Sequence, residues 1–174
     1  VIVDGSVAYS IVTAAAVSSD PNYSGIDAAN VAVSNSDNDV ASVVISESGG
    51  TTAVTEGGAS DSYTLVLSSQ PTANVSIVLT GTQVTAIPSP IVFTPANWSV
   101  AQTITVTAID DAIAEGAHSG SISSVVTSSD ANYQGFALAP LSVAITDNDN
   151  AGITLAQSGG NSFVNEAAAT EIYT

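Results

Sequence analysis

The sequence repeats itself at an offset of 110 residues, and this feature limits the fold more than any other. Residues 18–64 align with residues 128–174 without a gap, and 20 of the 47 aligned positions are identical. The shared segments include Ser-Ser-Asp at 18–20 and 128–130, and Asp-Asn-Asp at 37–39 and 147–149. Self-similarity at a fixed period is typical of tandem-repeat proteins. The chain is therefore predicted to fold as modules of about 110 residues.

The repeat divides the chain into three parts. Residues 1–39 are predicted to be the C-terminal part of one module, residues 40–149 a complete module, and residues 150–174 the N-terminal part of the next. Partial modules leave apolar faces and strand edges without partners. We therefore expect a longer chain, or neighbouring molecules in a filament, to complete them.

The hydrophobic pattern within residues 40–149 is that of β-strands. In the segment QTITVTA at 102–108, Ile104 and Val106 share one face and three threonines share the other. The same two-residue period occurs at 63–67, 75–79 and 141–145, and about seven such runs are separated by Gly, Pro and Asn turns. The pattern predicts an all-β fold, an antiparallel β-sandwich with Greek-key connections, repeated in a tandem array. No helix longer than one turn is expected.

The charge of the chain comes almost entirely from acids. It has 16 Asp and Glu residues, no Lys or Arg and one His, which gives a net charge of -16. Nucleic acid is excluded as a partner because nothing neutralises phosphates, and an anionic membrane surface would repel the chain. Membrane insertion is not expected, since the apolar runs are too short. With 45% hydrophobic residues the chain is expected to be globular.

The acids fall into two groups on the predicted strand map. Asp20, Asp27, Asp61 and Asp130 lie in loops or at strand starts, where we expect solvated turn residues. The others lie next to strand ends that a Greek key would bring to one pole of the sandwich: Glu56, Asp110, Asp111, Glu115, Asp147 and Asp149.

Such a pole stays folded near neutral pH only if its acids share protons or bind cations. Two carboxylates about 4 Å apart repel by about 1 kcal/mol in water and about 4 kcal/mol at the effective dielectric of a protein surface, and the chain has no Lys or Arg to offset this. Oxygen ligands in flexible loops suit Ca²⁺ better than zinc or copper, which prefer His or Cys, and better than magnesium, which keeps most of its waters. The sequence therefore predicts a Ca²⁺ site.

Four segments together resemble the Calx-beta domain, which occurs in sodium-calcium exchangers, in an integrin subunit and in long bacterial surface proteins. They are VTEGG at 54–58, FTPANW at 93–98, DDAIAEG at 110–116 and DND at 147–149. The resemblance implies an immunoglobulin-like sandwich of seven strands that binds calcium at one pole through the six acids named above. It gives the same role to Asp4, Asp37 and Asp39 in the preceding module and to Glu166 in the following one.

The chain also departs from the calcium-sensor members of that family. The segment AIPSP at 86–90 stands where they carry an aspartate, and the acidic loop at 110–116 has fewer acids. We therefore expect one or two calcium ions per module and not a larger cluster.

No catalytic group is expected, and the chain is predicted not to be an enzyme. His118 is the only imidazole and aligns with Val7 in the repeat, so we expect it to be a surface or strand-edge residue. No second His and no Lys is available to activate a serine. Trp98 is expected to pack against the core.

The module junction indicates a function. Residues 37–39 run into the next predicted strand with almost no linker, so an ion there would neutralise the pole, fix the angle between modules and stiffen the array. We predict a calcium-binding structural repeat of an extracellular filament, adhesin or matrix protein at a cell surface, bacterial in origin, with neighbouring modules as partners. The main alternative is a recognition module that binds carbohydrate or a receptor as a surface ligand, and a calcium sensor is a third.

Overall fold

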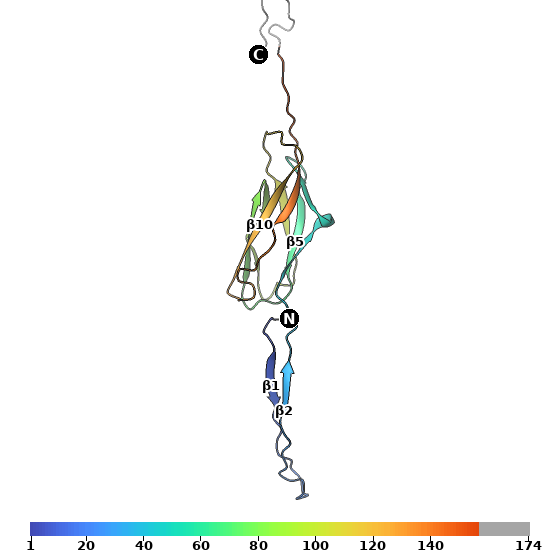
Figure 1. Ribbon diagram of the computed structural model, residues 1–174, viewed down its shortest axis with the longest axis vertical. Coiled ribbons are helices and arrows are strands. Elements are labelled where there is room, and N and C mark those ends of the chain that lie inside the picture. Colours follow the sequence, from blue (N-terminus) through green and yellow to red (C-terminus); the bar gives the residue numbers. More distant parts are fainter. Residues whose placement is uncertain (157–174) are drawn as a thin grey trace, which may run out of the picture.

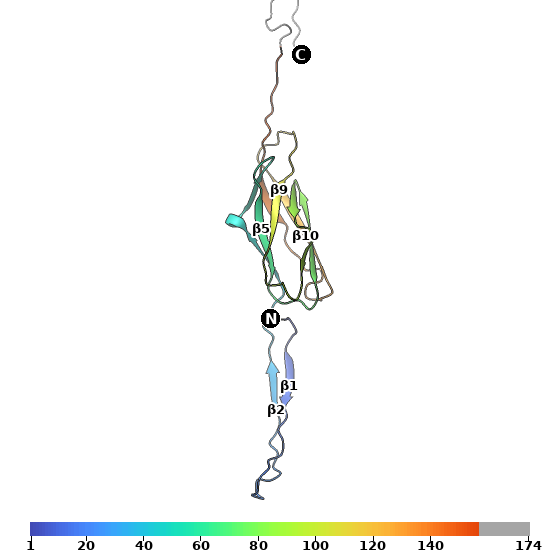
Figure 2. The same cartoon turned by 180° about the vertical axis from the view of Figure 1, so that it is seen from behind.

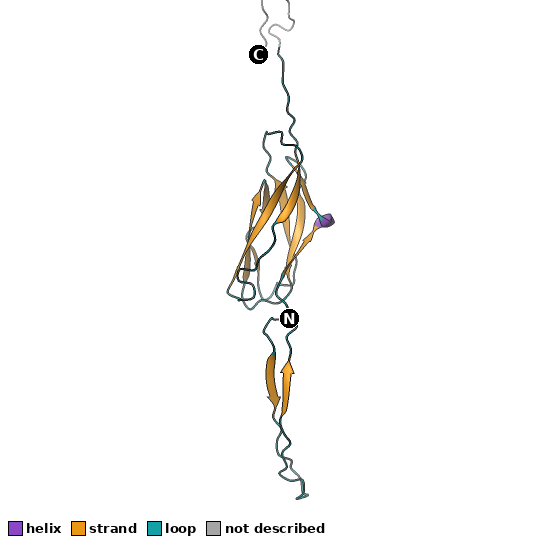
Figure 3. Cartoon of the chain, in the orientation of Figure 1, coloured by secondary structure: helices purple, strands orange, loops and turns teal. Residues whose placement is uncertain are grey.

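Strands account for almost all regular structure in the computed structural model, which describes residues 1–156 (Figure 3). The strands are β1 (Val7–Ile11), β2 (Val31–Asn35), β3 (Val43–Glu47), β4 (Thr52–Thr55), β5 (Asp61–Leu67), β6 (Val75–Thr82), β7 (Val84–Ile87), β8 (Ile91–Phe93), β9 (Gln102–Ala108), β10 (His118–Ser128) and β11 (Leu141–Thr146). A single 3₁₀ turn, η1 (Ser48–Gly50), separates β3 from β4. Within the described residues, no helix has the length and apolar character needed to cross a membrane.

The described chain is elongated (Figures 1 and 2). Strands β1 and β2 form an antiparallel pair at one end, and residues 1–39 are called the hairpin below. Strands β3 to β11 form a compact unit called the sandwich. After β11 the chain leaves the sandwich at the pole opposite the hairpin (Figure 1).

Two sheets make up the sandwich. One has the strand order β4-β11-β10-β6-β8 and the other β3-β5-β9-β7. The predicted all-β sandwich is confirmed, with two differences. It contains more strands than the seven expected, because strands as short as the three-residue β8 show no clear two-residue period. It is also not purely antiparallel, since β4 and β11 run parallel.

The core lies between the sheets and follows the alternation in the sequence. Tyr63, Leu65 and Leu67 of β5 are buried, and Ile104 and Val106 of the neighbouring strand β9 are buried beside them on the same face of the sheet. Trp98 is partly buried against this core, as expected. Residues two apart on a strand share a face, so the local pattern alone defines the buried side of each strand.

Asp130 is not the solvated turn residue that we expected. It is buried, and its carboxylate accepts hydrogen bonds from the backbone amides of Thr72, at 2.8 Å, and Asn132, at 2.9 Å. Burial raises the pKa of this carboxyl, but these hydrogen bonds outweigh burial and hold it below its usual value. The expectation failed because Thr72 is distant in the sequence and reaches Asp130 only through the fold.

Candidate metal centre

The parallel pairing of β4 with β11 builds the centre. Thr55 pairs with Thr146 at the end of the two strands, so the next residue of each strand, Glu56 and Asp147, emerges at the same pole. The amide of Glu56 donates to the carbonyl of Thr146 at 3.0 Å, which continues the ladder one step further. Glu56 is only 3% exposed. Two acids 91 positions apart in the sequence are thereby fixed side by side.

Asp147 organises the loop that follows β11. Its Oδ1 accepts a hydrogen bond from the amide of Asp149 at 2.7 Å, and its Oδ2 accepts one from the amide of Gly116 at 2.6 Å. These backbone donors, that of Asp149 first, lower the pKa of Asp147. Asp147 is therefore ionised at neutral pH, and its contacts hold the 110–116 loop against the end of β11.

Asp110 approaches the same loop from the end of β9. The side-chain amide of Asn148 donates to Asp110 Oδ1 at 3.2 Å. Gly57, with a φ of +58°, lies beneath this contact, and a Cβ there would come within 2.7 Å of the Asn148 amide nitrogen and 3.2 Å of both Asp110 oxygens. Glycine at this position therefore leaves room for the acidic loops to close over Glu56.

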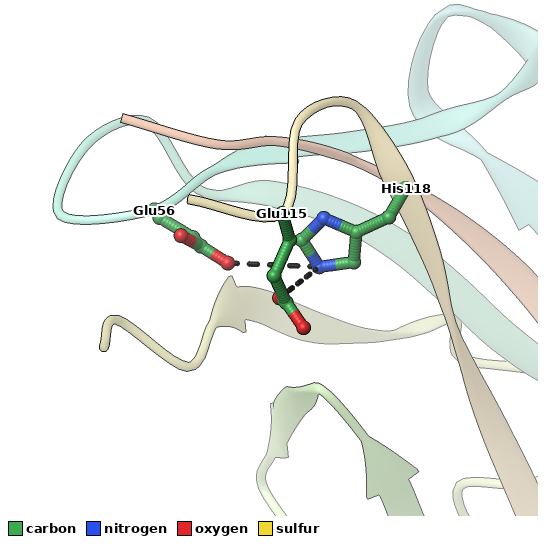
Figure 4. Close-up of side chains that lie close together, drawn as sticks. All are labelled: Glu56, Glu115 and His118. Carbon is green, nitrogen blue, oxygen red and sulfur yellow. Dashed lines mark ion pairs between the residues drawn. The ribbon is translucent and has the colours of Figure 1, made fainter. Parts of the chain in front are cut away.

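The remaining acids of the pole lie at its rim. Asp111 is exposed, and its Oδ1 accepts from the amide of Ile113 at 2.7 Å. Glu115 is exposed and points toward the imidazole of His118 (Figure 4). The structure thus brings all six predicted acids of the sandwich to one pole, with Glu56, Asp147 and Asp149 at its centre.

The electrostatics of the centre favour a cation. Burial, followed by the nearby charge of Asp147, raises the pKa of Glu56. The same causes raise the pKa of Asp149, with Asp110 contributing further. A carboxyl whose pKa rises for these reasons binds a proton or a metal ion more readily.

The donor atoms fit a hard cation. Glu56, Asp147 and Asp149 each offer a carboxylate oxygen, and these oxygens lie within 4.8 Å of one another. Glu56 Oε2 and Asp149 Oδ2 are buried and have no hydrogen-bond partner within residues 1–156. Buried unpaired carboxylate oxygens are costly, and Ca²⁺, which takes six to eight oxygen ligands at about 2.3–2.6 Å, would satisfy both. Asp110 and Asn148 lie where they could complete the shell.

The hairpin carries a similar but more open arrangement of acids. Asp37 Oδ2 accepts from the amides of Asp4, at 3.0 Å, and Gly5, at 2.7 Å, while its Oδ1 accepts from the amide of Asp39 at 2.9 Å. Backbone donors, that of Asp39 first, lower the pKa of Asp37. These bonds match those of Asp147 at the equivalent position. Glu166 lies outside the described residues.

His118 is the residue that sequence reasoning missed. We expected a surface or strand-edge histidine, but the imidazole at the start of β10 turns toward Glu56 and Glu115 (Figure 4). Its Nδ1 lies 2.9 Å from the carbonyl oxygen of Gly116. This carbonyl, and then Glu115, raise the pKa of His118. The available signal was its position two residues after the Glu115-Gly116 pair, at the start of a strand.

Comparisons with known proteins give distant matches in structure only. No protein-family model matches the chain, and no curated protein matches it. Among solved structures, the chain is similar to the apo form of the Calx CBD1 domain, with a TM-score of 0.40 and 19% identity over 62% of this chain and 98% of that chain. It is also similar to domains 4 and 5 of the S-layer protein SbsC, with a TM-score of 0.34 and 16% identity over 68% of this chain and 58% of that chain. Similarity at this level concerns the strand arrangement alone.

Proposed function

We propose that the chain is a calcium-binding, non-catalytic structural repeat of an extracellular filament, adhesin or matrix protein. The observation that carries this proposal is the pole of the sandwich, where Glu56 Oε2 and Asp149 Oδ2 are buried and unpaired in a chain without Lys or Arg. A divalent cation supplies the missing charge and the missing ligand contacts. The Calx-beta-like segments at 54–58, 110–116 and 147–149 support calcium as that cation.

Calcium at this pole would act on the direction in which the chain leaves the sandwich. The liganding residues Asp147 and Asp149 directly precede the exit segment, which points away from the hairpin (Figure 1). At the other pole, Asp39 is separated from the first residue of β3, Val43, by only three residues, and a cleft between hairpin and sandwich is lined by Asp4, Asp37, Asp39 and Gln70. An ion at each junction would hold successive modules in line.

Part of this proposal is that residues 1–39 and 150–174 belong to flanking modules. The hairpin has the register of β10–β11: Val7 pairs with Asn35 as His118 pairs with Ile145. The turns also agree, since the amides of Tyr23 and Tyr133 donate to the carbonyls of Asp20 and Asp130, both at 3.1 Å.

The hairpin lacks the partners that bury the equivalent residues of the sandwich. Tyr23 is 63% exposed and Ile11 54%, whereas Tyr133 is 1% exposed and Ile122 3%. We infer that the occupant of this apolar face is a partial module like residues 40–117, which would supply strands corresponding to β4 and β6. The proposed partner of each module is thus the next module of the array.

Thermal melting with and without calcium tests the calcium proposal. At a calcium concentration of 100 times its Kd, one site should stabilise the sandwich by about 2.7 kcal/mol relative to chelator. Asp149→Asn should remove most of this gain, and Asp27→Asn, which removes an exposed hairpin charge away from the pole, should keep it. An unchanged melting temperature in millimolar calcium and in chelator would refute the proposal.

An extended chain tests the array. A copy of residues 40–117 joined in front of Val7 should fold with the hairpin into a second sandwich. Val7 is equivalent to His118, so residue 117 of the added copy would be followed by the position that follows it in the sandwich. Calorimetry should show roughly twice the unfolding enthalpy, and Tyr23→Phe should become destabilising in the extended chain only. An added segment that melts without ordering the hairpin would contradict the assignment.

A further inference from the structure

The pole of the sandwich contains a second group of metal-binding side chains beside the proposed calcium ligands. Glu56, Glu115 and His118 each offer one ligand atom, and these atoms lie within 4.8 Å of one another. Figure 4 shows the Glu56 and Glu115 carboxylates converging on His118 Nε2. We propose that these three residues bind a divalent transition ion, of which Zn²⁺ is the representative, at a site adjoining the calcium site.

The distances fit a bridging ion better than direct hydrogen bonds. His118 Nε2 lies 3.6 Å from Glu56 Oε1 and 3.4 Å from Glu115 Oε2. Charge-assisted N–H to carboxylate bonds are about 2.7–2.9 Å long. Two ligands of a tetrahedral zinc ion, each about 2.0–2.1 Å from the metal, are separated by about 3.4 Å. Both distances from His118 Nε2 are therefore close to a ligand–ligand edge of a tetrahedral zinc site, in which water would take the fourth position.

The imidazole is held in the orientation that a metal ligand needs. Its Nδ1 lies 2.9 Å from the Gly116 carbonyl oxygen, and in the neutral tautomer Nδ1–H donates to that oxygen. The lone pair of Nε2 then points at the two glutamates. A hydrogen bond from the second ring nitrogen to a carbonyl is the usual support of a metal-ligating histidine. Nε2 is buried and has no hydrogen-bond partner in the part of the chain that the structure describes.

Glu56 connects this group to the proposed calcium ligands. Glu56 is only 3% exposed, and its Oε2 has no hydrogen-bond partner among residues 1–156. Oε1 faces His118, which leaves Oε2 for the group formed with Asp147 and Asp149. Glu56 is thus placed to bridge two ions of different preference, since imidazole nitrogen favours zinc-class ions and all-oxygen sets favour calcium.

The nitrogen ligand belongs to this sandwich and not to the repeat. The position equivalent to His118 in the hairpin is Val7, and the acids at that junction, Asp4, Asp37 and Asp39, offer oxygen alone. The zinc-class site therefore distinguishes one module from its neighbour, which the proposed calcium function does not require.

The chain has one histidine and no cysteine, so its imidazole resonances report on this site alone. The experiment uses the untagged 174-residue chain in millimolar calcium, titrated with ZnCl₂, with binding followed by calorimetry and by NMR of the His118 ring. We expect Zn²⁺ to shift the ring resonances at one equivalent. His118→Val, which installs the residue of the equivalent hairpin position, should weaken zinc binding by about tenfold or more and change calcium affinity by less than about twofold.

Asp149→Asn provides the reciprocal control, because it should weaken calcium binding and leave zinc binding intact. Unshifted imidazole resonances, or equal zinc affinity in the parent chain and His118→Val, would overturn the proposal. If His118→Val fails to fold in chelator, the NMR titration of the parent chain decides alone. Zinc binding without calcium binding would contradict the proposed function but support this zinc site. Calcium binding without an imidazole shift would support the proposed function but contradict this zinc site.

Discussion

The hydroxyl of Tyr133 is the clearest single group on which to test the energetics of the sandwich. It donates to the carbonyl oxygen of Ser69 at 2.7 Å, lies 2.8 Å from Ser69 Oγ and accepts from the Ser69 amide at 3.3 Å. Both residues are 1% exposed. Tyr133→Phe deletes this one oxygen and keeps the ring that packs in the core.

The expected loss follows from the groups left behind. A buried donor or acceptor that loses its partner costs about 1–3 kcal/mol, and here the carbonyl and amide of Ser69 lose theirs together. We therefore expect a destabilisation of about 2 kcal/mol. For a domain of this size each kcal/mol lowers the melting temperature by roughly 4–8 °C, so Tm should fall by about 10 °C.

Urea denaturation followed by Trp98 fluorescence measures the effect. Trp98 is the single tryptophan and packs against the sandwich core, so its emission reports unfolding of the sandwich and not of the hairpin. Tyr23→Phe is the matched control, because Tyr23 occupies the equivalent position but is 63% exposed. It should change stability by less than about 0.5 kcal/mol. Equal effects of the two substitutions would show that the buried hydroxyl contributes nothing, and the argument would be wrong.

Three other substitutions test the packing and the charges. Gly81→Ala should destabilise the sandwich by about 1–3 kcal/mol in urea denaturation, because a Cβ at Gly81 would lie 2.1 Å from the Val84 carbonyl oxygen. A Cβ at Gly152 would have nothing within 4 Å, so the control Gly152→Ala should be neutral. Equal effects of the two substitutions would contradict this reasoning. Burial and Asp147 raise the pKa of Glu56, so the folded state binds that proton more tightly. Without metal, the stability of the sandwich should therefore fall as pH rises through the raised pKa. Glu56→Gln should stabilise the metal-free chain at pH 7 but reduce the stability that it gains from calcium. A Glu56→Gln chain that is less stable than the parent in chelator would refute this. Burial raises the pKa of Tyr63 to about 12, so stability should decline from about pH 10, where an unfolded tyrosine ionises, up to about 12. Tyr63→Phe should reduce that decline, and an unchanged decline would argue against burial as its cause.

Much of the fold is predictable from the sequence because strand periodicity is local. The alternation in 63–67 and 102–108 defined the buried faces of β5 and β9 before any partner strand was known. The same strand pattern located the acidic segments at 110–116 and 147–149 next to strand ends. Connections between distant strands carry no comparable local signal, and the parallel pairing of β4 with β11 was not expected.

The candidate centre illustrates the same limit. Its acids could be named from the sequence, but the contact of Glu56 with Asp147 depends on the register of Thr55 with Thr146. The role of His118 was not predicted because its repeat partner is a valine. Comparison within the repeat hides a residue that only one module has. Nothing in the local sequence shows which way the imidazole of His118 turns at the start of β10.

By itself, the sequence determined the repeat, the strands, the absence of basic side chains and the identity of the acids. Tertiary structure alone decided which of these groups are buried and which touch. Tyr23 and Tyr133 make this plain, since they share the same local motif and the same turn but differ in exposure from 63% to 1%. Local sequence sets backbone conformation, whereas burial depends on strands that arrive from elsewhere in the chain, and only the sandwich has those strands.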